Sequence, residues 1–170
     1  MVELTTTLRQ LDSAVYYQAF YVPATTVAEL VEGERRVICC INGGYEWHAA
    51  LMHDGKGDYF INVSKEVRKA TGIEKGDEVV ITLRKDESKY GMPLPTELAE
   101  LCEIDPEAKE VFHQLTRGKQ RNLLHVIGKP KNSETRIKKA VQIMEYLKST
   151  GGKLDFKELN KAMKNANRIV

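Results

Sequence analysis

The sequence contains no long run of apolar residues. No stretch approaches the roughly 20 consecutive apolar residues that a membrane-spanning helix needs, and residues 1–7 have neither the basic nor the apolar segment of a secretory signal. Both absences argue against membrane-embedded and secreted proteins. We therefore expect no transmembrane segment and a cytoplasmic location.

Cysteine is scarce as well. The chain has three cysteines, Cys39, Cys40 and Cys102, and it has no Cys-x-x-Cys or histidine-rich spacing. Neighbouring residues of a strand point to opposite faces, so Cys39 and Cys40 cannot easily bond to each other or bind one ion together. We predict three reduced thiols, no metal site and no cofactor.

Recognised catalytic signatures are also missing. A nucleophile needs a base within hydrogen-bonding reach and a group that orients this base. The histidines at positions 48, 53, 113 and 125 are spread along the chain, and none belongs to a Gly-x-Ser-x-Gly or Cys/His pattern. Residues 72–77 resemble a phosphate-binding loop, but they lack its Gly-Lys-Ser/Thr ending. We expect a protein that is not an enzyme.

Charge is present in quantity and is distributed unevenly. The net charge of the chain is only +2. Residues 1–116 contain 12 lysines and arginines against 20 aspartates and glutamates, a net charge of −8, whereas residues 117–170 contain 14 against 4, a net charge of +10. Such an asymmetry indicates two units with different surroundings, and a chain of 170 residues is long enough for two small domains.

The N-terminal part has the pattern of a β unit. β-Branched and aromatic residues lie between turn signals, of which Asn42-Gly43-Gly44 is the strongest. The strands that we expect are residues 5–11, 15–22, 36–41, 45–52, 58–63 and 78–83. A short helix is expected over residues 65–71, with Ser64 as its N-cap and Gly72 at its end.

A loose internal repeat runs through the same part of the chain. The valines at positions 22, 27 and 37 recur at positions 63, 67 and 79, with an offset that drifts from 40 to 42 residues. Two strand–helix–strand halves that share one sheet can close it into a barrel, which leaves no exposed edge. We therefore predict an α+β protein with a small closed β-barrel over residues 1–90 and a helical unit over residues 91–170.

The helical unit begins after Pro93 and Pro95. Asp105-Pro106 is an N-cap followed by a proline at the first helical position, and Ser133 is the expected N-cap of the longest helix. The expected helices are residues 97–103, 106–115, 119–127, 134–150 and 156–165. The core-facing stripe expected on the longest helix is Ile137, Ala140, Val141, Met144 and Leu147.

The strand–helix–turn–strand pattern of residues 59–85 resembles the AbrB/MazE-like barrels. The resemblance covers roughly residues 4–86. It is carried by Val22-Pro23, Ile41-Asn42-Gly43, Gly55-x-Gly57, Val67-Arg68-Lys69 and Gly76-Asp77-x-Val79. It implies a closed barrel of the double-split type, and by analogy with the swapped dimers of that family it implies DNA binding.

Residues 93–165 resemble the helical YdeI/OmpD-associated tail, the bacteriocin-protection family. The carriers are Pro95 with Leu98, Asp105-Pro106, Phe112 with Leu115, Arg121, Ile127, Lys129, and Glu134-Thr135-Arg136 with Ile137. The order of barrel and tail resembles that of an uncharacterised bacterial family. The family usually has a further arginine just after Thr135-Arg136, where this chain has Ile137-Lys138-Lys139, so positive charge is retained without the bidentate geometry of arginine. The resemblance implies a link to stress and antimicrobial-peptide protection, and it implies no chemical activity.

The basic side chains of the tail form a first candidate site. The candidates for binding an anionic ligand or a protein partner are Arg117, Lys119, Arg121, Lys129, Lys131, Arg136, Lys138 and Lys139. Such a surface would attract nucleic acid, a phosphorylated ligand or lipid headgroups. The alternative is that these residues solvate the helices or pair with the acidic N-terminal part. Few aromatic residues lie among them, so nucleic acid is not the favoured partner.

The hairpin that begins at Asn42 forms a second candidate site. Trp47 is the only tryptophan, and together with Asn42 and Arg68 it could line a small-molecule or enzymatic pocket. In a regular strand Trp47 and His48 face opposite sides. This alternation favours Trp47 in the core and His48 on the surface.

The function that the sequence favours is that of a non-enzymatic binding protein in bacterial stress or bacteriocin protection, which uses its basic helical surface. A nucleic-acid-binding regulator of the AbrB-like type is the alternative. A second alternative is a small-molecule or enzymatic pocket near Asn42, Trp47 and Arg68. The sequence does not select an oligomeric state.

Overall fold

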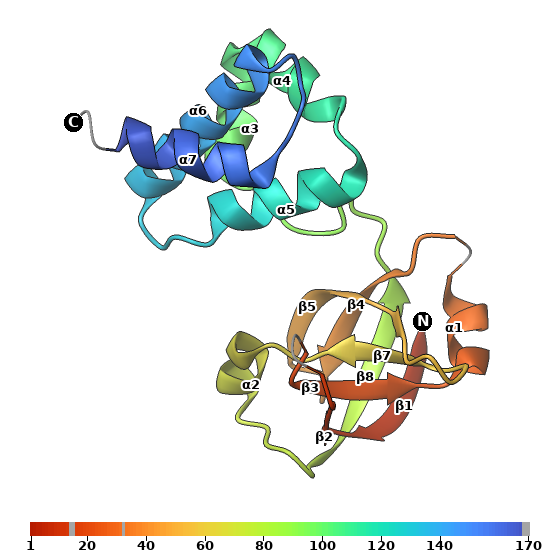
Figure 1. Ribbon diagram of the computed structural model, residues 1–170. Helices are drawn as coiled ribbons and strands as arrows, with labels where there is room; N and C mark the ends of the chain where they lie inside the picture. The colour runs from red at the N-terminus through yellow and green to blue at the C-terminus, as the bar shows by residue number, and fades with distance from the viewer. Residues whose placement is uncertain (14–15, 32, 168–170) are drawn as a thin grey trace. The chain divides into compact units, whose positions relative to one another are not determined.

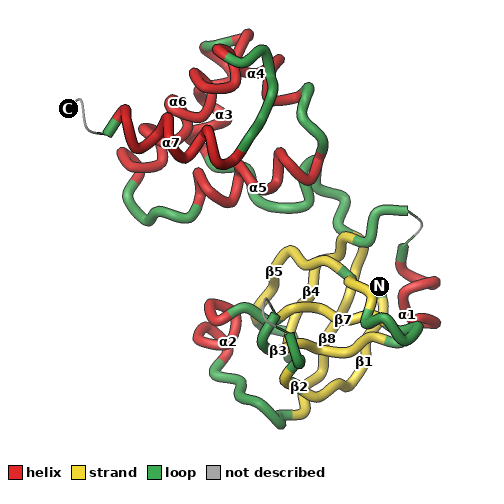
Figure 2. Tube along the Cα trace, viewed as in Figure 1, coloured by secondary structure: helices red, strands yellow, loops and turns green. Residues whose placement is uncertain are grey.

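The computed structural model describes residues 1–13, 16–31 and 33–167 of the chain. The chain divides into two compact units, Met1–Glu87 and Ser88–Val170, whereas the sequence placed the division after residue 90. The first unit consists mainly of strands and the second of helices (Figures 1 and 2). Each unit has its own cluster of buried apolar side chains, which is the usual property of a domain.

Two antiparallel sheets of four strands form the β unit. The first sheet has the strand order β1-β8-β4-β5, and the second has the order β2-β3-β7-β6. The strands are β1 (Val2–Thr7), β2 (Arg9–Gln10), β3 (Gln18–Val22), β4 (Arg36–Ile41), β5 (Tyr45–Ala50), β6 (Met52–His53), β7 (Tyr59–Asn62) and β8 (Glu78–Lys85). Two short helices, α1 (Ala24–Leu30) and α2 (Lys65–Thr71), complete the unit.

Two buried leucines mark the places where the chain passes from one sheet to the other. Only Leu8 separates β1 from β2, and only Leu51 separates β5 from β6. The amide of Leu8 donates to the carbonyl of Asp77 at 2.9 Å, and the amide of Leu51 donates to the carbonyl of Arg35 at 2.9 Å. Each corner is therefore held by a buried apolar side chain and by a backbone hydrogen bond to the residue just before β8 or β4.

The predicted fold class is confirmed as an α+β chain in which antiparallel sheets precede a helical region. The more specific prediction was that the strands of residues 1–90 close into a barrel. The ladders of the described strands form two sheets of four, and no ladder among these strands joins the two sheets into a ring. The corners at Leu8 and Leu51 account for this arrangement, because a strand that bends there exchanges its hydrogen-bonding partners for those of the other sheet.

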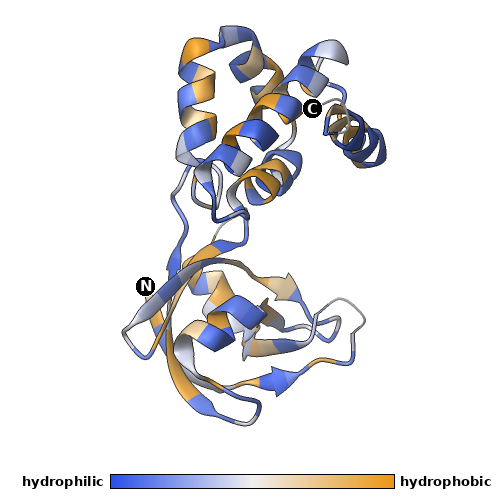
Figure 3. Ribbon diagram, turned by 90° about the vertical axis from the view of Figure 1, so that its left-hand side faces the viewer, coloured by the Kyte–Doolittle hydropathy of each residue, from blue (hydrophilic) through white to orange (hydrophobic). Residues whose placement is uncertain are grey.

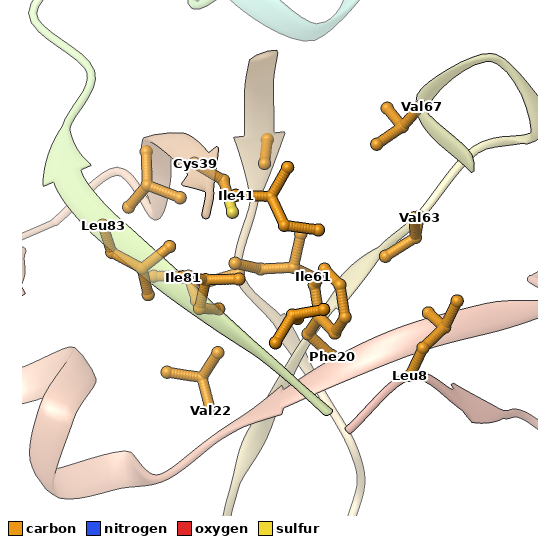
Figure 4. Packing of buried hydrophobic residues seen from close by; sticks show 14 of the residues in the cluster. Leu8, Phe20, Val22, Cys39, Ile41, Ile61, Val63, Val67, Ile81 and Leu83 are labelled. Atoms are coloured by element: carbon orange, nitrogen blue, oxygen red, sulfur yellow. The ribbon is translucent and has the colours of Figure 1, made fainter. Parts of the chain in front are cut away.

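The core of the β unit contains inward-facing residues of both sheets. Successive side chains of a strand alternate between its two faces, and the inward ones are apolar. Phe20 and Val22 of β3, Ile61 of β7, and Ile81 and Leu83 of β8 are fully buried in one cluster. Figure 4 shows these side chains converging from strands of both sheets.

Local signals in the sequence predicted the helix α2 correctly. The Ser64 hydroxyl accepts a hydrogen bond from the amide of Val67 at 3.2 Å, and Gly72 ends the helix with a φ of 71°. A hydroxyl N-cap and a glycine in the left-handed region are the usual ends of a helix. Strand β3 begins at Gln18, and Val15, its expected first residue, lies outside the described residues.

Five helices form the second unit. They are α3 (Thr96–Ile104), α4 (Pro106–His113), α5 (Arg117–Gly128), α6 (Ser133–Ser149) and α7 (Phe156–Ala166). Helix α6 packs against each of the other four, and Figure 3 shows that the helices carry both apolar and hydrophilic residues. Their apolar sides meet in a cluster that includes Leu98, Phe112, Leu124 and Ile143.

The apolar stripe predicted for α6 is wrong at two positions. Ala140 and Met144 are buried as expected, but Ile137 is 47% exposed and Val141 is 42% exposed. Ile143, which the stripe omitted, is fully buried. The neighbouring helices cover a side of α6 that is rotated from the predicted one, and the period of apolar residues alone does not reveal this rotation.

A glycine lets the end of α5 approach the start of α3. A Cβ atom added to Gly128 would lie 3.3 Å from Cγ of Pro95, the residue that precedes α3. This distance is shorter than the optimal separation of two carbon atoms, about 3.5–4.0 Å. The two helix ends are therefore in contact without space for a larger residue at position 128.

Replacing Phe20 by alanine should lower the free energy of unfolding of the β unit by about 3–5 kcal/mol, because the fully buried ring leaves a cavity. Trp47 is the only tryptophan and lies in this unit, so its fluorescence in a urea titration reports the β unit. The control is Tyr17→Ala, whose side chain is 67% exposed, with an expected loss below about 0.5 kcal/mol. Equal losses in the two variants would contradict the role of Phe20 in the core.

Candidate functional site

The net charges of the two units differ from those of the two segments, 1–116 and 117–170, that the sequence suggested. Residues 1–87 contain 10 lysines and arginines and 14 aspartates and glutamates, a net charge of −4, whereas residues 88–170 contain 16 and 10, a net charge of +6. Half of the net charge of −8 counted over residues 1–116 therefore lies on residues 88–116, which include α3 and α4. The helical unit holds its own acidic partners for its basic residues.

Arg136 holds a nearly buried carboxylate. Its Nε and Nη2 atoms lie 2.8 and 2.7 Å from Oε1 of Glu97 in α3, whose side chain is 7% exposed. The hydroxyl of Ser133 donates to the same oxygen at 2.8 Å. Nη1 donates to the carbonyls of Pro130 at 3.0 Å and Lys131 at 2.9 Å. One guanidinium thus joins α3, the loop before α6 and the first turn of α6.

This ion pair changes the protonation behaviour of both partners. The hydrogen bond from Arg136 lowers the pKa of Glu97 to about 2, and the backbone amide of Glu97 and the Ser133 hydroxyl act in the same direction. The same hydrogen bond raises the pKa of Arg136. Two charge-assisted N–H groups converge on one carboxylate oxygen, and charge-assisted hydrogen bonds are about twice as strong as neutral ones. Within the candidate set, Arg136 therefore has a structural role.

A second ion pair joins α6 to the start of α4. Nζ of Lys148 lies 2.7 Å from Oδ2 of Asp105 and 2.7 Å from Oε1 of Glu145. The hydrogen bond from Lys148 lowers the pKa of Asp105, whose other oxygen accepts from the amide of Ala108 at 3.0 Å. The acidic segment of α3 and α4 therefore neutralises two cations of α6.

Unlike Arg136, most of the other candidate cations form no ion pair within the described part of the helical unit. The candidates whose side chains form no ion pair with a carboxylate of residues 88–167 are Lys119, Arg121, Lys129, Lys131, Lys138 and Lys139. All six are exposed or half-buried, and Arg117, at the start of α5, is exposed. The helical unit thus presents basic side chains that its own fold does not neutralise.

The structure divides these cations into two groups. Residues 117–121 lie in the first turns of α5, whereas residues 129–131 follow its end, about 15 Å further along a helix that rises 1.5 Å per residue. Lys139 lies one turn after Arg136, on the same side of α6, and Lys138 lies on a different side. Because Arg136 binds the carbonyls of the loop, Lys139 lies on the side of α6 that carries this contact.

Asn42 of the second candidate site has a role in the backbone of a turn. Its φ of 48° is in the left-handed region, which asparagine tolerates better than most residues. Its amide donates to the carbonyl of Val80 at 2.8 Å, and its side-chain oxygen accepts from the amide of Val80 at 3.1 Å. Asn42 therefore extends the pairing of β4 with β8 by one residue.

Trp47 and Arg68 lie in neighbouring elements of the β unit. Trp47 in β5 is half-buried and packs against the core cluster, with its ring 6.2 Å from that of Tyr45. Arg68 in α2 is half-buried, and α2 packs beside β5. The structure thus brings these two elements together, while Asn42 is engaged in the turn.

His48 forms a contact that the sequence did not predict. Its Nδ1 lies 2.8 Å from Oδ2 of Asp86, whose side chain is 1% exposed. His48 is paired with Ile38 in the register of β4 and β5. Ile38 is buried although it does not belong to the core cluster. The pair of His48 and Asp86 therefore lies on the outer face of the first sheet, at the position of this isoleucine.

A pocket of about 360 Å³ lies in another part of the β unit. Its lining residues are Leu11, Asp12, Ser13, Tyr16, Tyr21, Asp54, Lys56 and Phe60. None of the three residues predicted to line a pocket, Asn42, Trp47 and Arg68, belongs to this set. The sequence does not reveal this pocket, because its lining comes from two segments, residues 11–21 and 54–60, that are about 40 residues apart along the chain.

The described residues, 1–13, 16–31 and 33–167, include all three cysteines. No group of three or more histidine, cysteine, aspartate or glutamate residues in these ranges is placed to hold a metal ion. Cys39, Cys40 and Cys102 are free thiols, and burial raises the pKa of Cys39. None of the helices in these ranges combines the length and the apolar character that crossing a bilayer requires.

Two families match separate parts of the chain. Residues 5–83 match a family described as a domain of unknown function (DUF1905). Residues 92–149 match a family described as "Bacteriocin-protection, YdeI or OmpD-Associated". The two matches support an architecture of two domains, one for each match. No match to a curated protein was found.

The ion pair of Glu97 should make the stability of the helical unit depend on pH. Because folding lowers the pKa of Glu97 from 4.5 to about 2, its contribution is present above about pH 4.5 and is lost as the pH falls towards 2. The difference in free energy of unfolding between the wild type and Glu97→Gln should therefore shrink from pH 5 to pH 2. Far-UV circular dichroism during urea unfolding measures it. In the exposed control Glu100→Gln the difference should stay near zero, and a constant difference for Glu97→Gln would refute the linkage.

Proposed function

We propose that this protein is a non-enzymatic binding protein of bacterial stress or bacteriocin protection, and that its helical unit binds an anionic ligand or protein partner. The biological context comes from the match of residues 92–149 to the bacteriocin-protection family. The chemistry comes from the surplus positive charge of the helical unit, +6 over residues 88–170. A positive surface of this kind raises the local concentration of anions and steers their approach.

The observation that carries the proposal is the division of the basic residues into two classes. Arg136 and Lys148 are paired with carboxylates of α3 and α4. Lys129, Lys131 and Lys139, which we call the loop cluster, form no ion pair with a carboxylate of residues 88–167. A cation without a carboxylate partner in its own unit is available to an external anion.

The loop that carries two of these lysines is held in place before any ligand arrives. Arg136 donates to the carbonyls of Pro130 and Lys131, and the side chain of Asn132 accepts a hydrogen bond from the amide of Thr135 at 3.1 Å. A loop that is already ordered loses less conformational freedom on binding. Lysine supplies a mobile point charge rather than a planar fork, so the loop cluster suits a carboxylate or phosphate group in varied orientations.

We propose that the fold of the β unit is related to the AbrB-like barrel. This likeness concerns the fold and carries no function with it. The β unit has a net charge of −4 over residues 1–87, which repels phosphate at long range. In α2 and the following turn, Lys65 and Lys69 alternate with Glu66 and Glu74. We therefore assign anion binding to the helical unit.

The test is a charge reversal in the loop cluster. The full-length variant with Lys129→Glu, Lys131→Glu and Lys139→Glu should bind a fluorescein-labelled polyglutamate peptide at least about tenfold more weakly than the wild type, because three attractive charges become repulsive. Fluorescence anisotropy measures the affinity. Wild-type binding should weaken as sodium chloride is raised from 0.05 to 0.5 M, since salt screens exposed charges.

The matched control makes the same change of charge on the β unit. The variant with Lys65→Glu, Lys69→Glu and Lys85→Glu alters three exposed lysines and should retain most of the wild-type affinity. Equal losses in both variants would show that only the net charge matters and would refute a site at the loop cluster. A random DNA duplex that competes only while the β-unit lysines are intact would instead support the nucleic-acid-binding regulator.

A further inference from the structure

The outer face of the second sheet carries an apolar surface that the core does not use. Ala19 of β3 and Phe60 of β7 are buried, yet neither belongs to the core cluster. Tyr21 and Phe60 are direct partners in the register of these two strands, so their side chains lie on the same face of the sheet. Because these buried side chains lie outside the core cluster, residues other than those of the core must shield them from water.

The connection between β2 and β3 supplies part of this cover. The amide of Leu11 donates to the carbonyl of Tyr17 at 2.9 Å, which closes the hairpin. The ring of Tyr16 lies with its centroid 5.9 Å from that of Phe60, at an angle of 63°. This edge-to-face geometry is favourable for aromatic pairs. Tyr16 and Phe60 therefore form one aromatic wall of the pocket.

The turn between β6 and β7 supplies a carboxylate. Oδ1 of Asp54 accepts hydrogen bonds from the amides of Lys56 at 2.7 Å and Asp58 at 3.1 Å, which shapes the turn. Oδ2 of Asp54 accepts no hydrogen bond from the described residues of the β unit. Asp12, in the hairpin connection, lines the same pocket. The lining thus contains two carboxylates and one ammonium group, that of Lys56.

The size of the pocket suits a small organic molecule. Its volume of about 360 Å³ lies within the usual range of ligand pockets, roughly 300–1,000 Å³, and such pockets combine apolar walls with a few polar groups. Tyr21 already holds a cation on one side, because the guanidinium carbon of Arg9 lies 5.4 Å from its ring centroid. Aromatic rings beside carboxylates form a suitable environment for an organic cation.

We propose that this pocket binds a small organic amine, a primary ammonium group carried on an aromatic or aliphatic body. The ammonium group pairs with Oδ2 of Asp54 and with Asp12, and the body packs against Tyr16 and Phe60. This site lies in the β unit and prefers a positive ligand, so it is independent of the anion-binding function proposed for the helical unit.

The experiment is a titration of the ¹⁵N-labelled full-length protein with phenethylamine, followed by two-dimensional NMR. Phenethylamine joins a benzene ring to a primary ammonium, and with about nine non-hydrogen atoms it should bind with a dissociation constant of roughly 1 mM. Saturable shifts are expected for amides of residues 11–13, 16–21 and 54–60. Phenylacetate, which joins a similar ring to a carboxylate, should produce no saturable shift at these residues of the β unit, whatever it does at the helical unit.

Two substitutions in the turn between β6 and β7 test whether the pocket prefers a positive or a negative ligand. Asp54→Asn keeps the side-chain oxygen that accepts from the amides of Lys56 and Asp58, and it removes the negative charge. It should weaken phenethylamine binding about tenfold. Lys56→Gln removes the competing cation and should tighten binding about two- to fivefold. An anion-binding pocket would show the opposite response to both substitutions.

Other outcomes would overturn the proposal. They are the absence of saturable shifts at the pocket residues with 20 mM phenethylamine, an unchanged affinity in Asp54→Asn, and binding of phenylacetate at the pocket residues as tight as that of phenethylamine. If Asp54→Asn fails to fold, Asp12→Asn replaces it, because Asp12 is exposed and its carboxylate accepts no hydrogen bond from described residues of the β unit. Asp12→Asn should weaken binding at least about threefold, and an unchanged affinity would refute the site.

Discussion

The arrangement of the helical unit depends on the neutralisation of one carboxylate. Glu97 is almost fully removed from water, and a buried charge without a partner is costly. Arg136 supplies the opposite charge, and its remaining donors bind two carbonyls of the loop before α6. The position of this loop, and hence of Lys129 and Lys131, follows from the same contact. Arg136 therefore stabilises the fold, whereas the neighbouring Lys129 and Lys131 lie exposed at the surface.

Short-range signals predicted the elements well and failed where distant residues intervene. Ser64 and Gly72 bound α2 as expected, because capping involves only adjacent residues. Ser133 was expected to cap α6, but its hydroxyl donates to Glu97, and Asn132 caps the helix. The carboxylate that takes the hydroxyl is 36 residues away along the chain. For the same reason, periodicity could not show which side of α6 the other helices cover.

The candidate sites were harder to predict than the elements, because they depend on what covers the outer faces of the sheets. Strand β4 is apolar on both faces. This pattern predicts that both faces are buried, but it does not show which residues cover the outer one. The structure places His48 and Asp86 on its outer face, and these residues are 38 positions apart. Phe60 is covered in a similar way by Tyr16. The basic residues were easy to select from the sequence. The ion pairs of the structure were needed to show which of them bind a carboxylate of the helical unit.

The contact between Gly128 and Pro95 has a consequence for the evolution of the helical unit. A methyl group at position 128 would press on the proline ring at 3.3 Å, so either the ring or the end of α5 would have to shift. A substitution at one of these positions therefore changes which residues selection accepts at the other. Related sequences should show the two positions varying together, with a larger residue at 128 accompanied by the loss of the proline at 95.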